Sequence, residues 1–141
     1  MVGTYITKSP DQTKELASKV AKSISQGDII ALIGDLGTGK TAFTQGLAKA
    51  IGIEEAVGSP TFKLISEYQG ISFLLYHIDC YRLENVQQFV NIGGDEYLAS
   101  VNGVTVIEWA DIIEEILPAN TIKIHFKRKA GNPDHRELIV S

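Results

Sequence analysis

Residues 34–41 have the residue types and spacing of a phosphate-binding loop, G-x-x-x-x-G-K-[S/T]. Glycines allow the backbone to curl until consecutive N–H groups point into one concavity, where they can hold phosphate oxygens. The Lys40 ammonium would reach the β- and γ-phosphates, and the Thr41 hydroxyl would ligate Mg²⁺. The residues expected around the nucleotide are Asp35, Leu36, Gly37, Thr38, Gly39, Lys40, Thr41 and Ala42.

The flanking sequence has the elements that such a loop needs. Residues 29–33 form an apolar, β-branched run typical of a buried strand. Apolar side chains then recur every four residues, at Phe43, Leu47 and Ile51, before Gly52. This spacing predicts a helix that ends at the glycine. The phosphates would therefore lie at a helix N-terminus, where free N–H groups and the helix dipole favour anions.

Residues 37–42 also fit the looser dinucleotide-binding pattern. That interpretation leaves Lys40 and Thr41 without a role. It also requires an acidic residue at the end of a second strand about 20 residues on. Residues 57–61 read Val-Gly-Ser-Pro-Thr instead, so mononucleotide binding is favoured.

Two acidic residues directly follow apolar, strand-like runs. Asp79 comes after residues 73–78, and Glu108 comes after residues 104–107. Ligands of such sheets bind beyond the carboxyl ends of the parallel strands, and Mg²⁺ takes one or two carboxylate ligands there. One carboxylate could hold the metal while the other orients or deprotonates the attacking water. The sequence leaves both assignments open.

Other residues near these carboxylates have two interpretations each. Thr61 lies on a loop that could close over the γ-phosphate, or in a simple proline turn. Arg82 could neutralise charge on the transferred phosphate, or form a surface ion pair. His77 is either a positioning group for Asp79 or a core histidine. We interpret Trp109 as a core residue rather than a platform for the base.

The rest of the chain alternates between helix and strand patterns. Ser9, Pro10 and Gln12 predict a capped helix start, with Ser9 as N-cap and Gln12 completing a capping box, and the helix is expected to end at Gly27. Interspersed helices and strands imply an α/β fold whose sheet is covered on both faces, and two hairpins make that sheet mixed. A first hairpin is expected at residues 62–68 and 71–78, with its turn at 69–70, and a second at 121–127 and 136–140, with its turn at 131–133. Between them, residues 83–100 are expected to form one or two short helices broken at 93–94, and residues 104–107 a short buried strand.

Composition restricts the class of protein. The 141 residues, 44% of them hydrophobic, suit one domain spanning residues 1–141. No apolar stretch approaches the ~20 residues of a membrane span, and no signal peptide is evident, so we expect a cytoplasmic protein without membrane contact. Cys80 is expected to be a small buried residue.

The net charge of −4 argues against a free-standing nucleic-acid binder. The basic cluster is interpreted as a solvated sheet edge, or alternatively as a contact for RNA or an acidic partner; it comprises Lys123, Lys127, Arg128, Lys129 and Arg136.

Four motifs, in this order, resemble those of the TsaE (YjeE) family of bacterial P-loop ATPases. They are residues 35–41 (DLGTGKT), 59–62 (SPTF), 77–82 (HIDCYR) and 107–109 (IEW). The resemblance runs from about residue 9 to residue 118, and residues 95–98 (DEYL) also fit. The phosphate loop is shared by many NTPases, whereas the combination with the other three motifs is specific.

The resemblance implies properties beyond those argued from the residues. It implies a P-loop NTPase-like three-layer sandwich with a mixed, about seven-stranded sheet that ends in an antiparallel hairpin. It implies ATP and Mg²⁺ as cofactors, two switch-like loops at residues 59–62 and 77–82, and Glu108 as an essential acid. It also implies two partner proteins, TsaB and TsaD, which transfer a threonylcarbamoyl group onto the adenosine next to the anticodon of tRNA. ATP hydrolysis would reset or license that assembly between turnovers, and tRNA contact would be indirect, through the partners.

Two alternatives remain at this level. A small-molecule kinase of P-loop type would need a second substrate pocket and usually several lid arginines, whereas this chain has only Arg82, Arg128 and Arg136. A nucleotide-dependent scaffold would bind phosphates through Lys40 without hydrolysing them. Phosphate transfer to small alcohols would support the first alternative, and the lack of single-turnover hydrolysis with the partners would support the second.

Overall fold

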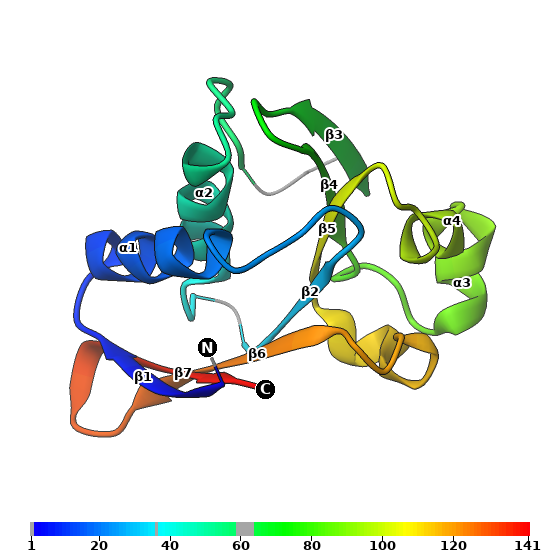
Figure 1. The fold of residues 1–141 in the computed structure, drawn as a ribbon. Coiled ribbons are helices and arrows are strands. Elements are labelled where there is room, and N and C mark those ends of the chain that lie inside the picture. Colours follow the sequence, from blue (N-terminus) through cyan, green and yellow to red (C-terminus); the bar gives the residue numbers. More distant parts are fainter. Residues whose placement is uncertain (1, 36, 59–63) are drawn as a thin grey trace.

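A computed structural model describes residues 2–35, 37–58 and 64–141 of the chain. Its strands form one seven-stranded sheet in the order β1-β7-β6-β2-β5-β4-β3, with helices on both faces (Figure 1). The strands are β1 (Gly3–Thr7), β2 (Ile29–Ile33), β3 (Ile65–Gln69), β4 (Leu74–Asp79), β5 (Gly103–Glu108), β6 (Ile122–Lys129) and β7 (Asn132–Val140). The helices are α1 (Pro10–Ala21), α2 (Lys40–Ala50), α3 (Val86–Asn91), α4 (Gly94–Leu98) and the 3₁₀ helix η1 (Ala110–Ile116).

The sheet is mixed, as predicted. Its centre consists of four parallel strands, β6, β2, β5 and β4, while β3, β7 and β1 pair antiparallel to their neighbours. Parallel strands covered on both faces are expected to be apolar throughout, and every residue of β5 is buried. The carboxyl ends of the four parallel strands therefore meet at one edge of the sheet, where the predicted site lies.

Two separate apolar clusters hold the helices to the sheet. On one face α1 and α2 pack through residues that include Leu16, Phe43 and Leu47. On the other face α3, α4 and η1 lie over Ile78 and Ile107. Cys80 belongs to this second cluster, as expected, and burial raises the pKa of its thiol to about 12. Both faces of the central strands are thereby removed from water, which is the main favourable term for this fold.

The first helix begins as predicted but ends earlier. The Ser9 side chain caps α1 by accepting a hydrogen bond from the Gln12 N–H, at 3.1 Å. The Gln12 side chain accepts from the N–H of Lys8 instead of Ser9, at 2.7 Å, so the capping box is shifted by one residue. The helix ends at Ala21 rather than near residue 27. Its last turn tightens into i→i+3 hydrogen bonds, and the Ser23 hydroxyl donates to the carbonyl of Val20.

Both hairpins differ from their predicted turns. The β3–β4 connection spans residues 70–73, because the Ile71 N–H donates to the carbonyl of Ile51 after α2 and leaves the strand ladder. In the second hairpin β7 begins at Asn132, so the turn lies at residues 130–131 rather than 131–133. The two short helices at 83–100 and the strand at 104–107 are confirmed. Strand β1, which pairs with β7, and the 3₁₀ helix η1 are additional elements.

Candidate functional site

The phosphate loop joins β2 to α2 in a geometry that only glycine permits at two positions. A Cβ on Gly34 would lie 2.7 Å from the carbonyl oxygen of Phe126 on β6, so this glycine allows close packing against the neighbouring strand. Gly39 is the N-cap of α2 with φ of 102°, in the left-handed region. The Thr38 hydroxyl donates to the carbonyl of Asp35 at 2.6 Å and closes the loop. Leu36, predicted to contact the nucleotide, lies outside the described residues.

A cavity of about 770 Å³ lies beside this loop. That volume is in the range of small-molecule sites, roughly 300–1,000 Å³. The predicted site residues that line it are Gly37, Gly39, Lys40, Thr41, Ala42, Asp79, Arg82 and Glu108. The structure therefore brings together residues from the loop and from two strand ends. Thr61, predicted to lie near the γ-phosphate, is outside the described residues.

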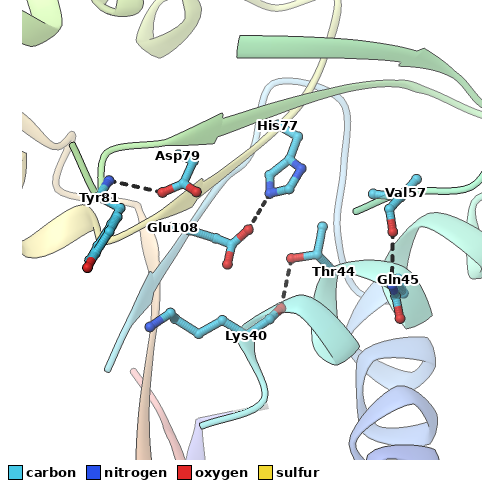
Figure 2. Close-up of polar contacts among 8 residues, drawn as sticks. All are labelled: Lys40, Thr44, Gln45, Val57, His77, Asp79, Tyr81 and Glu108. Carbon is cyan, nitrogen blue, oxygen red and sulfur yellow. Dashed lines mark hydrogen bonds and ion pairs between the residues drawn. The ribbon is translucent and has the colours of Figure 1, made fainter. Parts of the chain in front are cut away.

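The two candidate carboxylates come from neighbouring parallel strands. Asp79 ends β4 and Glu108 ends β5, and the two are direct register partners. Glu108 is buried and Asp79 is half-buried. Burial raises the pKa of Asp79, an effect that the hydrogen bond from the Tyr81 N–H, at 2.9 Å, partly opposes. Figure 2 shows both carboxylates on the same side of the strands as the Lys40 side chain.

Lys40 is held inside the site by acceptors of its own loop. Its ammonium donates to the carbonyl oxygens of Gly34 and Asp35, the latter at 3.1 Å. Burial lowers the pKa of Lys40, while the nearby charges of Glu108 and Asp79 act in the opposite direction. The buried ammonium of Lys40 suits a polyanion, and the carboxylates of Glu108 and Asp79 beyond it suit a cation. The arrangement therefore fits a polyanion that binds together with its own counter-cation.

His77 contacts Glu108 rather than Asp79. Its Nε2 lies 2.5 Å from Oε2 of Glu108, and both side chains are buried (Figure 2). His77 is the register partner of Val106, so Glu108 is its diagonal neighbour on β5. Diagonal neighbours on one face are within reach of long side chains, which explains why the contact crosses strands instead of following β4. Of the two interpretations, the structure supports the buried core histidine, and its hydrogen-bond partner is Glu108 rather than Asp79.

Trp109 packs against a core cluster, as predicted, and it also lines the cavity. It follows β5 with φ of 57° and ψ of 40°, a left-handed conformation that is uncommon outside glycine. Its ring centroid lies 4.1 Å from Nζ of Lys40 and 5.0 Å from the ring of Tyr81. The ring also packs against the core cluster beneath η1. A cation over an indole face at this distance is favourable.

The cavity has a second side that the sequence did not indicate. The start of α1 contributes Lys8, Ser9, Pro10 and Thr13, and β7 contributes Asp134 and Arg136. Arg136 donates through Nη2 to the carbonyl of Gly37 at 3.1 Å, so part of the basic cluster lies against the phosphate loop rather than at a solvated edge. The strand order explains this placement, because β6 lies between β2 and β7.

The residues present fit Mg²⁺ that arrives with phosphates. Within the described ranges, no group of three or more His, Cys, Asp and Glu side chains could hold a metal ion by itself. Mg²⁺ usually takes one or two carboxylates together with phosphate oxygens and waters. Thr41, Asp79 and Glu108 supply oxygen donors of that kind at one cavity.

Comparison with known proteins agrees with this geometry. The family model described as "Threonylcarbamoyl adenosine biosynthesis protein TsaE" matches residues 7–138. The chain belongs to the TsaE family. It is 45% identical over 132 residues to the tRNA threonylcarbamoyladenosine biosynthesis protein TsaE of Bacillus subtilis, covering 94% of this chain and 80% of that protein. The namesake protein of Treponema pallidum is 36% identical over 136 residues, covering 96% and 98%.

A solved structure confirms the fold. The crystal structure of Bacillus subtilis YdiB superposes with a TM-score of 0.81 and 39% identity, covering 99% of this chain and 86% of that chain. The predicted α/β fold with a mixed, seven-stranded sheet is therefore confirmed, as is the resemblance to the family. Among the described residues, no helix is long and apolar enough to span a membrane.

Proposed function

We propose that the protein is an ATP-binding, Mg²⁺-dependent ATPase subunit that acts in tRNA threonylcarbamoyladenosine biosynthesis. The main support is one observation: Lys40, Thr41 and the register partners Asp79 and Glu108 line the same cavity beside a glycine-rich loop. Family membership supports the pathway, which the names of the relatives state. The preference for adenine follows the family resemblance.

The proposed chemistry assigns a role to each element of the site. The loop N–H groups and the α2 N-terminus bind the phosphates, and Lys40 turns from its carbonyl acceptors toward them. Mg²⁺, when bound, would supply charge neutralisation to the phosphates. Thr41 and Glu108 would hold it, and the hydrogen bond with His77 fixes the Glu108 carboxylate for that role. Asp79, half-buried at the cavity edge, orients the attacking water.

We propose that hydrolysis regulates or resets a TsaB–TsaD transferase complex. An accessory subunit of this kind needs only a nucleotide site and a surface that responds to it, which suits a short chain. The net charge of −4 fits indirect contact with tRNA through the partners. The place of action is then the cytoplasm, where tRNA is modified.

Single-turnover hydrolysis tests this function. Purified protein is mixed with Mg²⁺ and labelled ATP below the enzyme concentration, alone and with TsaB and TsaD. The proposal expects slow hydrolysis by the protein alone and faster hydrolysis with the partners. Nucleotide binding without hydrolysis in either mixture would favour a scaffold. Phosphate transfer to an added alcohol or nucleoside would favour a kinase.

A further inference from the structure

The terminal hairpin places two arginines directly opposite each other. Arg128 on β6 and Arg136 on β7 are register partners. Like charges directly opposite in an antiparallel pair are destabilising. The adjacent pair, Lys127 and Glu137, has opposite charges, as a stable hairpin prefers. The register contact between Arg128 and Arg136 therefore does not by itself stabilise the hairpin.

These two arginines lie on the face that meets the phosphate loop. Phe126 and Leu138, the next register pair on that face, belong to the core cluster under α1 and α2. Lys127 and Glu137 alternate to the other face. Arg136 lines the nucleotide cavity, whereas Arg128 lines an adjoining hollow together with Asp35 and Thr38 of the phosphate loop.

Both guanidinium groups lie near the same loop residue. Arg136 Nη2 donates to the carbonyl of Gly37 at 3.1 Å, and its Nη1 donates to the carbonyls of Pro133 and His135. A Cβ built on Gly37 would lie 2.5 Å from Nη2 of Arg128. Among the residues that the structure describes, the acceptors of Arg136 are neutral carbonyl oxygens, whereas guanidinium groups bind carboxylates and phosphates more strongly.

We infer that Arg128 and Arg136 form a clamp for the phosphates of the bound nucleotide. An anion between the two guanidinium groups removes their mutual repulsion, and the planar fork of arginine matches phosphate geometry. The clamp rests on the proposed function and adds two positive charges to that of Lys40. It also assigns a specific role to part of the basic cluster.

Variants of the two arginines test the clamp by calorimetry. The ligands are MgADP, a non-hydrolysable MgATP analogue and adenosine, each at two salt concentrations. Arg128→Gln and Arg136→Lys are expected to weaken binding of both nucleotides about tenfold or more, since each variant loses charge-assisted hydrogen bonds to phosphate. Adenosine binding should not change. Lys49→Gln, at an exposed position in the last turn of α2 away from the clamp, is the matched control and should bind all ligands like the wild type.

A second readout separates the clamp from a structural role. Without nucleotide, Arg128→Gln should melt close to the wild-type temperature, because the variant loses a like-charge contact together with the other contacts of the guanidinium. The same variant should gain less thermal stability than the wild type when MgADP is added. A structural role predicts the opposite, with lower stability of the free protein and an unchanged gain.

The remaining outcomes distinguish the clamp from the proposed function. Unchanged nucleotide affinity in both arginine variants, with normal wild-type binding, overturns the clamp and leaves the ATPase proposal intact. Unchanged nucleotide affinity together with weaker binding to TsaB and TsaD assigns the arginines to a protein contact and also overturns the clamp. If the wild type binds no nucleotide, the proposed function and the clamp are both wrong.

Discussion

His77 Nε2 and Glu108 Oε2 lie 2.5 Å apart across two neighbouring strands, and both side chains are buried. A buried carboxylate needs a hydrogen-bond donor, and the imidazole N–H provides one. Among the residues that the structure describes, Nδ1 of His77 has no hydrogen-bond partner. The hydrogen bond of this ring is therefore the one that Nε2 makes with Glu108. The contact fixes the carboxylate that we propose holds Mg²⁺.

Replacing His77 should therefore affect both stability and activity. His77→Leu leaves the Glu108 carboxylate buried without its donor, which should lower the free energy of unfolding by about 1–3 kcal/mol. The hydrolysis rate should fall as the carboxylate loses its orientation. His77→Gln, which retains an N–H donor, should recover part of both losses. Urea denaturation and single-turnover hydrolysis measure the two effects, and a leucine variant equal to the wild type in both would contradict this role.

Glu108→Gln should separate nucleotide binding from hydrolysis. The amide keeps the size of the side chain but loses the charge that would hold Mg²⁺ near the reacting phosphate. We expect ADP affinity within about threefold of the wild type and hydrolysis lower by about 10²-fold or more. Glu115→Gln, an exposed position on η1, is the control. Hydrolysis at the wild-type rate by Glu108→Gln would show that another residue performs this task.

The pH dependence of stability should report on Asp79. Burial raises its pKa above the ordinary value of 3.8, so ionisation costs more in the folded state than in the unfolded state. The favourable contribution is present below the unfolded-state pKa and is lost as pH rises through the raised folded-state pKa. Asp79→Asn should thus be more stable than the wild type near pH 7, with the difference vanishing toward about pH 3. Thermal melts without Mg²⁺ or nucleotide test this, and a less stable variant near neutral pH would contradict it.

The packing of α1 on α2 depends on Gly46. A Cβ at this position would lie 2.6 Å from Cα of Lys14 and 2.7 Å from its carbonyl oxygen. Gly46→Ala gains up to about 1 kcal/mol in helix propensity, but forcing two backbones apart costs about 1–3 kcal/mol. We expect a net loss of stability in denaturant melts. Gly58→Ala, where a Cβ would meet nothing within 4 Å, is the control and should lie within about 0.5 kcal/mol of the wild type.

Local patterns were sufficient to predict the centre of the site. The phosphate loop, its strand and its helix follow from a motif and from apolar spacing within residues 29–52. The approach of Asp79 to Glu108 follows from a general property of parallel strands, whose carboxyl ends meet at one edge. These features depend on neighbours in sequence or on rules common to all such sheets.

Other features depend on tertiary contacts that no local pattern contains. Ile24 continues the apolar spacing of α1 and is buried, yet it lies beyond the end of the helix. Strand β1 is a short edge strand that exists through pairing with β7. Trp109 reaches the cavity because its own backbone, directly after β5, is left-handed. Arg136 reaches it because the strand order places β7 beside β6, next to the phosphate-loop strand β2. The contact of His77 with Glu108 required the register of β4 and β5.

Calorimetric titration of the purified protein with ATP, with and without Mg²⁺, tests the central claim most directly. The wild type should bind ATP more tightly with Mg²⁺, and Lys40→Ala should weaken that binding about 10- to 100-fold because a charged contact to phosphate is lost. Lys49→Ala, exposed in the last turn of the same helix, should bind like the wild type. Folded wild-type protein that shows no Mg²⁺-dependent binding of ATP would contradict the account.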